Sequence, residues 1–244
     1  MTSFAFGIIT IVALLGSIIS GVFGIGGGIL LISVMAQYFS PTLLIPLHAV
    51  VLLVSNISRS AMSFKNIKWK ITLHFALGCP IGVGLASFFV TKIPEGAFQI
   101  ILGSAIILLT WMPKIKKAPK IRGKFFVLGL CSSFLSMFIG ATGPLIMAFY
   151  SRENLSKEEL VATESTGQIF THSLKIISYI FLGFQIVEHT PFLSVLCFAA
   201  IIGTSVSKMI LTKISDKFFT IGLKTLLTLL ALRTLYLGVS TYLN

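Results

Sequence analysis

The most regular feature of the sequence is a series of eight long apolar runs, separated by short polar segments. The runs cover residues 4–39, 43–64, 70–90, 96–112, 125–150, 160–182, 191–211 and 218–240. They lack the alternation of apolar and polar residues that is typical of strands in an outer-membrane barrel. A helix that crosses a membrane needs roughly 20 apolar residues, which is close to the length of most of these runs. The pattern therefore predicts an all-α polytopic membrane protein.

The composition supports this class and excludes several others. Of the 244 residues, 55 % are hydrophobic and 11 % are charged, whereas a soluble domain carries about 25 % charged residues. A soluble globule, a disordered chain and a nucleic-acid-binding domain are thereby excluded. The net charge of +12 lies mostly in short loops, and such a basic excess marks cytoplasmic loops. We expect a multi-pass protein of the cytoplasmic membrane.

The second half of the sequence repeats features of the first. Val90–Glu95 matches Leu211–Asp216, and the glycine-rich Phe23–Gly28 matches Phe138–Gly143 at an offset of 115 residues. Internal repeats are common in transporters. The predicted organisation is a first transmembrane repeat (1–113), a basic cytoplasmic connecting loop (114–123) and a second transmembrane repeat (124–244).

Loop charge predicts that the two repeats are inverted. The loops 65–70, 113–124 and 208–217 are basic and should be cytoplasmic, whereas 183–190 carries Glu188 and should lie outside. Eight simple crossings cannot satisfy this. The conflict disappears if the first run of each half enters the membrane, breaks at its glycines and leaves on the same side. Each half is then a glycine-broken re-entrant or discontinuous helix hairpin followed by three transmembrane helices.

The two glycine-rich breaks, 24–28 and 140–144, are called elbows below. Glycine permits a positive φ, and Pro144 suits the first turn of a helix. Each elbow therefore predicts a helix end followed by a new helix N-terminus, whose free N–H groups and positive dipole end attract anions. The alternative is close glycine packing between helices. No strand precedes either elbow, so a dinucleotide site is rejected.

The helices after the elbows each carry one polar stripe. The two helices align with each other at an offset of 116 residues. On each helix, the polar positions fall within a sector of about 100° of the circumference. They are His48, Ser55, Asn56 and Arg59 in the first half, and Glu164, Gln168, Thr171, His172 and Lys175 in the second. Ionisable residues within a bilayer are costly and usually face a cavity on a substrate path. Other interpretations remain open. Arg59 or Lys175 could snorkel to the membrane surface, His172 could be a packed residue, and His48 and Glu164 could have interfacial roles.

With these residues identified, the chain resembles the sulfite exporter TauE/SafE family. The resemblance rests on Phe23–Gly28, on Gly140–Pro144, on Gly82 with Gly203, and on a Thr-Lys-Ile segment in each half. It implies a secondary transporter that moves small sulfur anions, such as sulfite or sulfonates, usually outward. Ala141 and Thr142 depart from the usual glycine-rich second elbow, which leaves the substrate open.

The predicted function is export of small sulfur-containing anions by alternating access, with one half rocking against the other around a central anion site. The alternative is an anion channel, or a permease for another small organic anion. The expected substrate-binding residues are Gly26, Gly27, Gly28, Asn56, Arg59, Thr142, Gly143, Gln168, His172 and Lys175, with His48 and Glu164 as candidates for proton coupling. We expect the substrate or Glu164 to hold the Lys175 ammonium group.

Other classes and partners follow from what the sequence lacks. It contains no H-E-x-x-H or G-x-S-x-G motif, so no enzyme is expected, and no metal or cofactor is called for. The expected partners are the anion and the lipid bilayer, a homodimer is left open, and nucleic acid is not expected.

Overall fold

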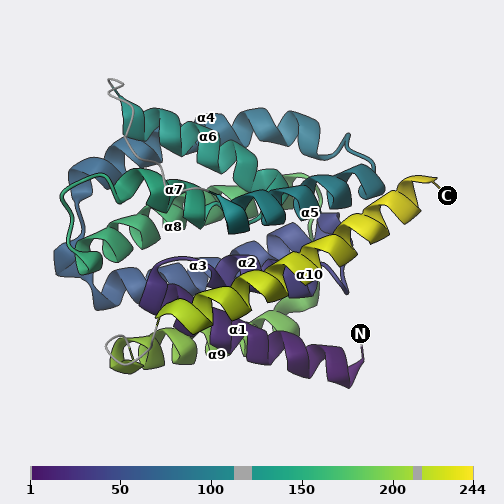
Figure 1. Ribbon diagram of the computed structural model, residues 1–244. Helices are drawn as coiled ribbons and strands as arrows, with labels where there is room; N and C mark the ends of the chain where they lie inside the picture. The colour runs from purple at the N-terminus through teal and green to yellow at the C-terminus, as the bar shows by residue number, and fades with distance from the viewer. Residues whose placement is uncertain (1, 113–122, 211–215, 244) are drawn as a thin grey trace.

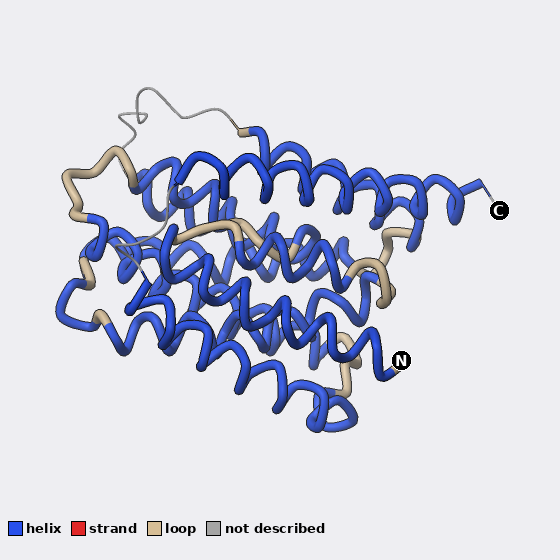
Figure 2. The backbone as a smooth tube through the Cα atoms, turned by 60° about the horizontal axis from the view of Figure 1, so that its bottom comes forward, coloured by secondary structure: helices blue, strands red, loops and turns tan. Residues whose placement is uncertain are grey.

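The computed structural model describes residues 2–112, 123–210 and 216–243, and this part of the chain consists of helices joined by short loops (Figures 1 and 2). The helices are α1 (Ser3–Phe23), α2 (Gly27–Met35), α3 (Pro41–Met62), α4 (Trp69–Val90), α5 (Glu95–Trp111), α6 (Lys124–Ile139), α7 (Gly143–Tyr150), α8 (Lys157–Phe181), α9 (Thr190–Ile210) and α10 (Asp216–Leu243), with short 3-10 turns η1 (Phe64–Asn66) and η2 (Ile186–His189). Residues 114–122 of the predicted connecting loop, and 211–215 of the second Thr-Lys-Ile segment, lie outside the described residues.

Among the described residues, five segments are long and apolar enough to cross a membrane. They are Ser3–Phe23, Pro41–Met62, Trp69–Val90, Ile186–Met209 and Ile221–Leu243. Two further apolar helices, α5 and α6, are shorter. The chain is therefore a multi-pass α-helical membrane protein, as the apolar runs predicted.

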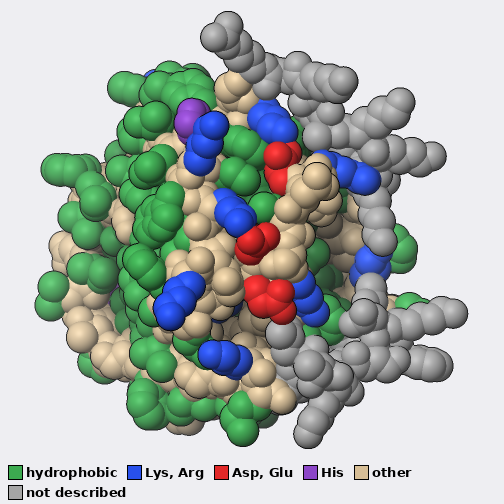
Figure 3. Space-filling model, turned by 90° about the vertical axis from the view of Figure 1, so that its left-hand side faces the viewer, with side chains coloured by type: hydrophobic (Ala, Val, Ile, Leu, Met, Phe, Trp, Pro, Cys, Tyr) green, Lys and Arg blue, Asp and Glu red, His purple; other side chains and the backbone are tan. Residues whose placement is uncertain are grey.

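The helices run between two chemically different ends of the molecule. One end, called the basic end below, presents several lysine and arginine side chains and fewer acidic ones (Figure 3). Ion pairs Lys68–Glu159 and Lys124–Glu153 join its loops and helix starts. The N- and C-terminal ends of the described chain lie together at the opposite, terminal end (Figure 1). Phe192, at the start of α9, contacts the Phe6 ring there.

Both elbows have the predicted conformation. At the end of α1, Gly24 adopts φ +74° and donates its N–H to Ser20 O at 2.8 Å. At the end of α6, Gly140 adopts φ +72° and donates to Ser136 O at 3.0 Å. New helices then start, α2 at Gly27 and α7 at Gly143, and α7 has its proline in the first turn. A helix end followed by a fresh N-terminus is confirmed at each elbow.

The register between the elbows differs from the expected one. Gly24 corresponds to Gly140, 116 residues later, rather than to Ile139, which the offset of 115 would pair with it. The reason is the backbone. Each helix ends at a residue with positive φ, which glycine adopts without strain, and this requirement outweighs the likeness of the neighbouring side chains.

Helices from the two halves pack together in matched pairs: α1 against α9, α4 against α6, α3 against α8 and α5 against α10. The first two pairs meet through glycines. A Cβ on Gly82 would meet Leu130 O and Ser133 Oγ of α6, and a Cβ on Gly203 would meet Leu14 O and Ser17 Cβ of α1. Leu14 and Ser17 precede Leu130 and Ser133 by 116 residues. Small residues at these crossings let the backbones approach closely.

Candidate functional site

A small cavity lies where the two elbows face α3 and α8. Its volume is about 30 Å³, enough to enclose a water molecule. It is lined by Ser20, Gly24, Ile25, Gly26, Gly28, Ile29, Leu52, Asn56, Arg59, Ala141, Gly143, Pro144, Glu164, Gln168 and His172. The first turns of both α2 and α7 contribute to its wall. Two helix N-termini, separated by more than a hundred residues in the sequence, therefore meet at one site.

Apart from Ser20 of α1, the polar side chains of the cavity come from one face each of α3 and α8, which pack against each other. On α8 these residues are Glu164, Gln168 and His172, and their spacing of four residues places them on one side of the helix. The start of α8 is fixed by a capping box, in which Ser156 and Glu159 bond each other's backbone N–H groups. Lys68 donates a hydrogen bond to Glu159, which lowers the pKa of that partly exposed carboxyl group.

Arg59 is buried beside the cavity and is held by the end of α1. Its side chain is 7 % exposed. Nη1 donates to Ser20 O at 3.1 Å, and Nη2 donates to Asn56 Oδ1 at 2.5 Å. The guanidinium group thus lies against the negative end of the α1 dipole, where a cation is favourable. These contacts argue against snorkelling to the membrane surface.

Lys175 has the matching role at the end of α6. Its side chain is 0 % exposed, and Nζ donates to Ser136 O at 3.2 Å, Ser136 Oγ at 2.7 Å and Gly140 O at 2.9 Å. Ser136 follows Ser20 by the same 116 residues that separate Lys175 from Arg59. In the structure, backbone carbonyls and a hydroxyl group of α6 hold this ammonium group, whereas Glu164 does not.

Several buried polar atoms in the cavity wall have no hydrogen-bond partner among the described residues. They are Arg59 Nε, Glu164 Oε2, Gln168 Oε1, and both ring nitrogens of His172. Buried polar groups in folded proteins are nearly always paired, so an unpaired group calls for a missing ligand, ion or water. Such a concentration around one cavity is typical of a binding site.

Eight of the twelve residues predicted for the site line the cavity: Gly26, Gly28, Asn56, Arg59, Gly143, Glu164, Gln168 and His172. The other four lie just outside it. Gly27 packs on the backbone of Gly16, and Lys175 caps α6. His48 Nε2 bonds Gly28 O at 2.9 Å. Thr142 is buried, with its hydroxyl group unpartnered in the described chain.

The sequence-based prediction missed part of the wall. Ser20 is one of three serines in the otherwise largely apolar α1 and gives no recognisable signal. Leu52 could have been found, because the 116-residue alignment places it opposite Gln168. Ile25, Ile29 and Ala141 are apolar elbow residues whose orientation no pattern specified.

The arrangement suits a small oxyanion. The N-terminal ends of α2 and α7 supply backbone N–H groups and positive dipole ends. Arg59 adds a positive side chain, while Gln168 and His172 can donate or accept hydrogen bonds. In the part of the chain that the structure describes, no group of three or more His, Cys, Asp or Glu residues could hold a metal ion.

Comparison with known proteins gives one match. A family model described as sulfite exporter TauE/SafE matches residues 9–234 of this chain. No curated protein and no solved structure matches it.

Proposed function

The chain belongs to the sulfite exporter TauE/SafE family of membrane permeases, and from this premise we propose that it transports small sulfur oxyanions, sulfite or sulfonates, through the central cavity. The observation that carries the proposal is the meeting of two helix N-termini at one small cavity, together with buried polar atoms that have no partner among the described residues. An oxyanion would accept hydrogen bonds from the N–H groups. It would also partner Arg59 Nε and the His172 ring.

Transport by alternating access needs two related halves, and we take the fold as two inverted repeats, 1–113 and 124–244. The proposal is supported by the order of helices, which is long, short, long, long, long in each half. A constant offset of 116 residues separates the two elbows from each other and Arg59 from Lys175, and this offset supports the proposal as well. Each of these basic side chains caps the broken helix of its own half.

The inter-half packing modifies the expected motion. Because α1 packs on α9, and α6 packs on α4, neither half forms a separate body that could rock as a unit. The moving bodies in our proposal are therefore helix pairs drawn from both halves. Release of Arg59 from the end of α1, or of Lys175 from the end of α6, would open the cavity toward one side at a time.

Glu164 is the proposed site of proton coupling. A Cβ on Gly143 would lie 3.5 Å from Glu164 Oε1, so the carboxyl group lies close to the first residue of α7. An ionised Glu164 would compete with an anionic substrate for the positive end of this helix. Protonation of Glu164 when the anion binds would remove that competition and link the flux of the two species.

The orientation can be tested by cysteine labelling. We expect cysteines at Asn66 and Lys124, in the basic end, to react with a membrane-impermeant thiol reagent only from the cytoplasm. A cysteine at Val187 should react only from outside. The physical reason is the excess of lysine and arginine at the basic end (Figure 3). Labelling of positions 66 and 187 from one side would contradict the inverted arrangement.

The function itself is tested by sulfite flux in proteoliposomes that contain the purified protein. Flux should saturate with sulfite concentration, and Gly143→Leu should abolish it while the protein remains folded, because the new side chain enters the cavity beside Glu164. Gly84→Leu is the matched control, since a Cβ on Gly84 meets nothing within 4 Å. Normal flux through Gly143→Leu would refute the cavity as the substrate path, and flux that does not saturate would indicate a channel.

A further inference from the structure

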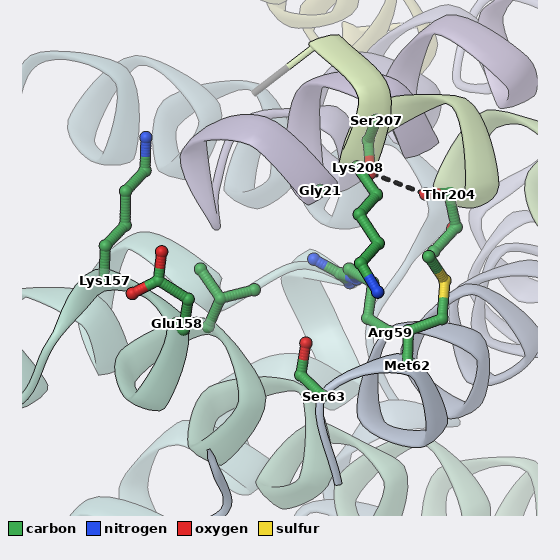
Figure 4. A pocket seen from close by; sticks show the side chains of 10 residues that line it. Gly21, Arg59, Met62, Ser63, Lys157, Glu158, Thr204, Ser207 and Lys208 are labelled. Carbon is green, nitrogen blue, oxygen red and sulfur yellow. Dashed lines mark hydrogen bonds between the residues drawn. The ribbon is translucent and has the colours of Figure 1, made fainter. Parts of the chain in front are cut away.

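A second cavity, called the vestibule below, lies at the basic end of the molecule. Its volume is about 70 Å³. It is lined by Gly21, Arg59, Met62, Ser63, Lys157, Glu158, Val161, Thr204, Ser207 and Lys208, from the ends of α1, α3 and α9 and the start of α8 (Figure 4). Three of these side chains are basic and one is acidic. Nothing in the proposed central site requires this second concentration of positive charge.

Arg59 is the single residue that lines both the vestibule and the central cavity in the described structure. Nη1 and Nη2 are taken by Ser20 O and Asn56 Oδ1, whereas Nε is buried and has no partner in the described chain. The buried guanidinium group therefore lies between the two spaces, and its Nε–H remains available to a ligand.

The other side chains of the vestibule are arranged for an anion. In Figure 4, the Lys208 amine and the Ser63 hydroxyl point toward the space beside Arg59, whereas the Glu158 carboxylate and the Lys157 amine point away from it. On the side formed by α1 and α9, tight packing closes the vestibule. A Cβ on Gly21 would overlap the Ser207 side chain, and Ser207 Oγ donates to Thr204 O at 2.6 Å.

We propose that the vestibule is a loading site, in which Lys208 and Arg59 bind the oxyanion at the basic end before it passes Arg59 into the central cavity. This proposal rests on the proposed function. The two cations attract the anion from solution, because a cleft lined by charges of one sign concentrates counter-ions. Arg59 then holds the anion from either side, so that the anion keeps a charged partner as it moves inward.

The loading site can be tested without measuring transport. In protein with Cys131 and Cys197 replaced by alanine, Ser63→Cys places a thiol in the vestibule, and Ser151→Cys places one outside it at the same end. At each position we compare the reaction rates of two methanethiosulfonate reagents, the anionic ethylsulfonate and its cationic trimethylammonium analogue. We expect the ratio of the anionic rate to the cationic rate to be about tenfold higher at position 63 than at position 151. Lys208→Gln should reduce this preference. Sulfate should protect position 63 alone, at constant ionic strength set with chloride; sulfite is avoided because it would attack the reagent.

Flux provides the second measurement. Lys208→Gln should raise the half-saturating sulfite concentration about threefold, as expected for a lost local attraction, and leave the maximal rate unchanged. Lys65→Gln, which removes the same charge at the same end but outside the vestibule, is the control. Equal reagent preference at positions 63 and 151, in a protein that transports sulfite, would overturn the loading site. If sulfate protects Cys at position 63 but the wild-type protein transports no sulfite, the proposed function is overturned and the anion site stands.

Discussion

Replacing Lys175 by methionine is expected to lower the free energy of unfolding by about 2–3 kcal/mol. The ammonium group makes three hydrogen bonds to the end of α6, and a hydrogen bond to a charged group is worth roughly 1.5–3 kcal/mol. Methionine keeps most of the side-chain volume but leaves Gly140 O without this donor. We expect a protein that unfolds at lower temperature and has lost its flux, because the second elbow is no longer held.

Thermal unfolding in detergent measures this loss, followed by the reaction of a dye with the buried thiol of Cys79 in protein with Cys131 and Cys197 replaced by alanine. Lys92→Met is the control, since Lys92 is exposed. The double variant Glu164→Gln/Lys175→Gln should not recover anion binding, because Lys175 forms no ion pair with Glu164 in the described structure. A Lys175→Met protein as stable as the wild type, yet unable to bind anions, would identify the lysine as a substrate ligand.

His172→Leu should have the opposite combination of effects. Both ring nitrogens are buried and lack partners among the described residues, so their removal relieves a desolvation cost of about 1 kcal/mol or more. We expect stability that equals or exceeds that of the wild type. Sulfite affinity should fall by at least about tenfold, which corresponds to the loss of one hydrogen bond of roughly 1.4 kcal/mol.

The same dye assay and an anion titration of the purified protein measure both quantities. His74→Leu is a suitable control, because His74 is an exposed histidine outside the cavity. A destabilised His172→Leu protein would mean that the ring has a structural role. Unchanged sulfite affinity would remove His172 from the site. A gain in stability at the expense of binding is common at functional positions.

The sequence predicted those parts of the structure that are encoded locally. The elbows could be located because Gly24 and Gly140 are required where the backbone takes a positive φ. The stripe of Glu164, Gln168 and His172 could be located because helical periodicity brings these residues to one face. Both signals lie within a few residues of the feature that they predict.

The remaining parts depend on contacts that a sequence pattern does not contain. The acceptors of Lys175 include two backbone carbonyls, which every residue possesses, so side-chain types could not identify them. Gly27 and Gly28 are neighbours with the same side chain, yet Gly27 packs on Gly16 while Gly28 faces the cavity. Only the direction of α2 relative to α1 separates the two roles.

The packing of α1 on α9 also has a consequence for biosynthesis. The chain is made from its N-terminus, and α9 begins only at Thr190. The face of α1 that includes Leu14, Ser17 and Gly21 must therefore remain in contact with lipid, or with the insertion machinery, until most of the chain has been translated. In contrast, α4 meets its partner α6 soon after synthesis. We expect assembly to start with the packing of α4 against α6. The fold is then completed only when the last helices pack against the first ones.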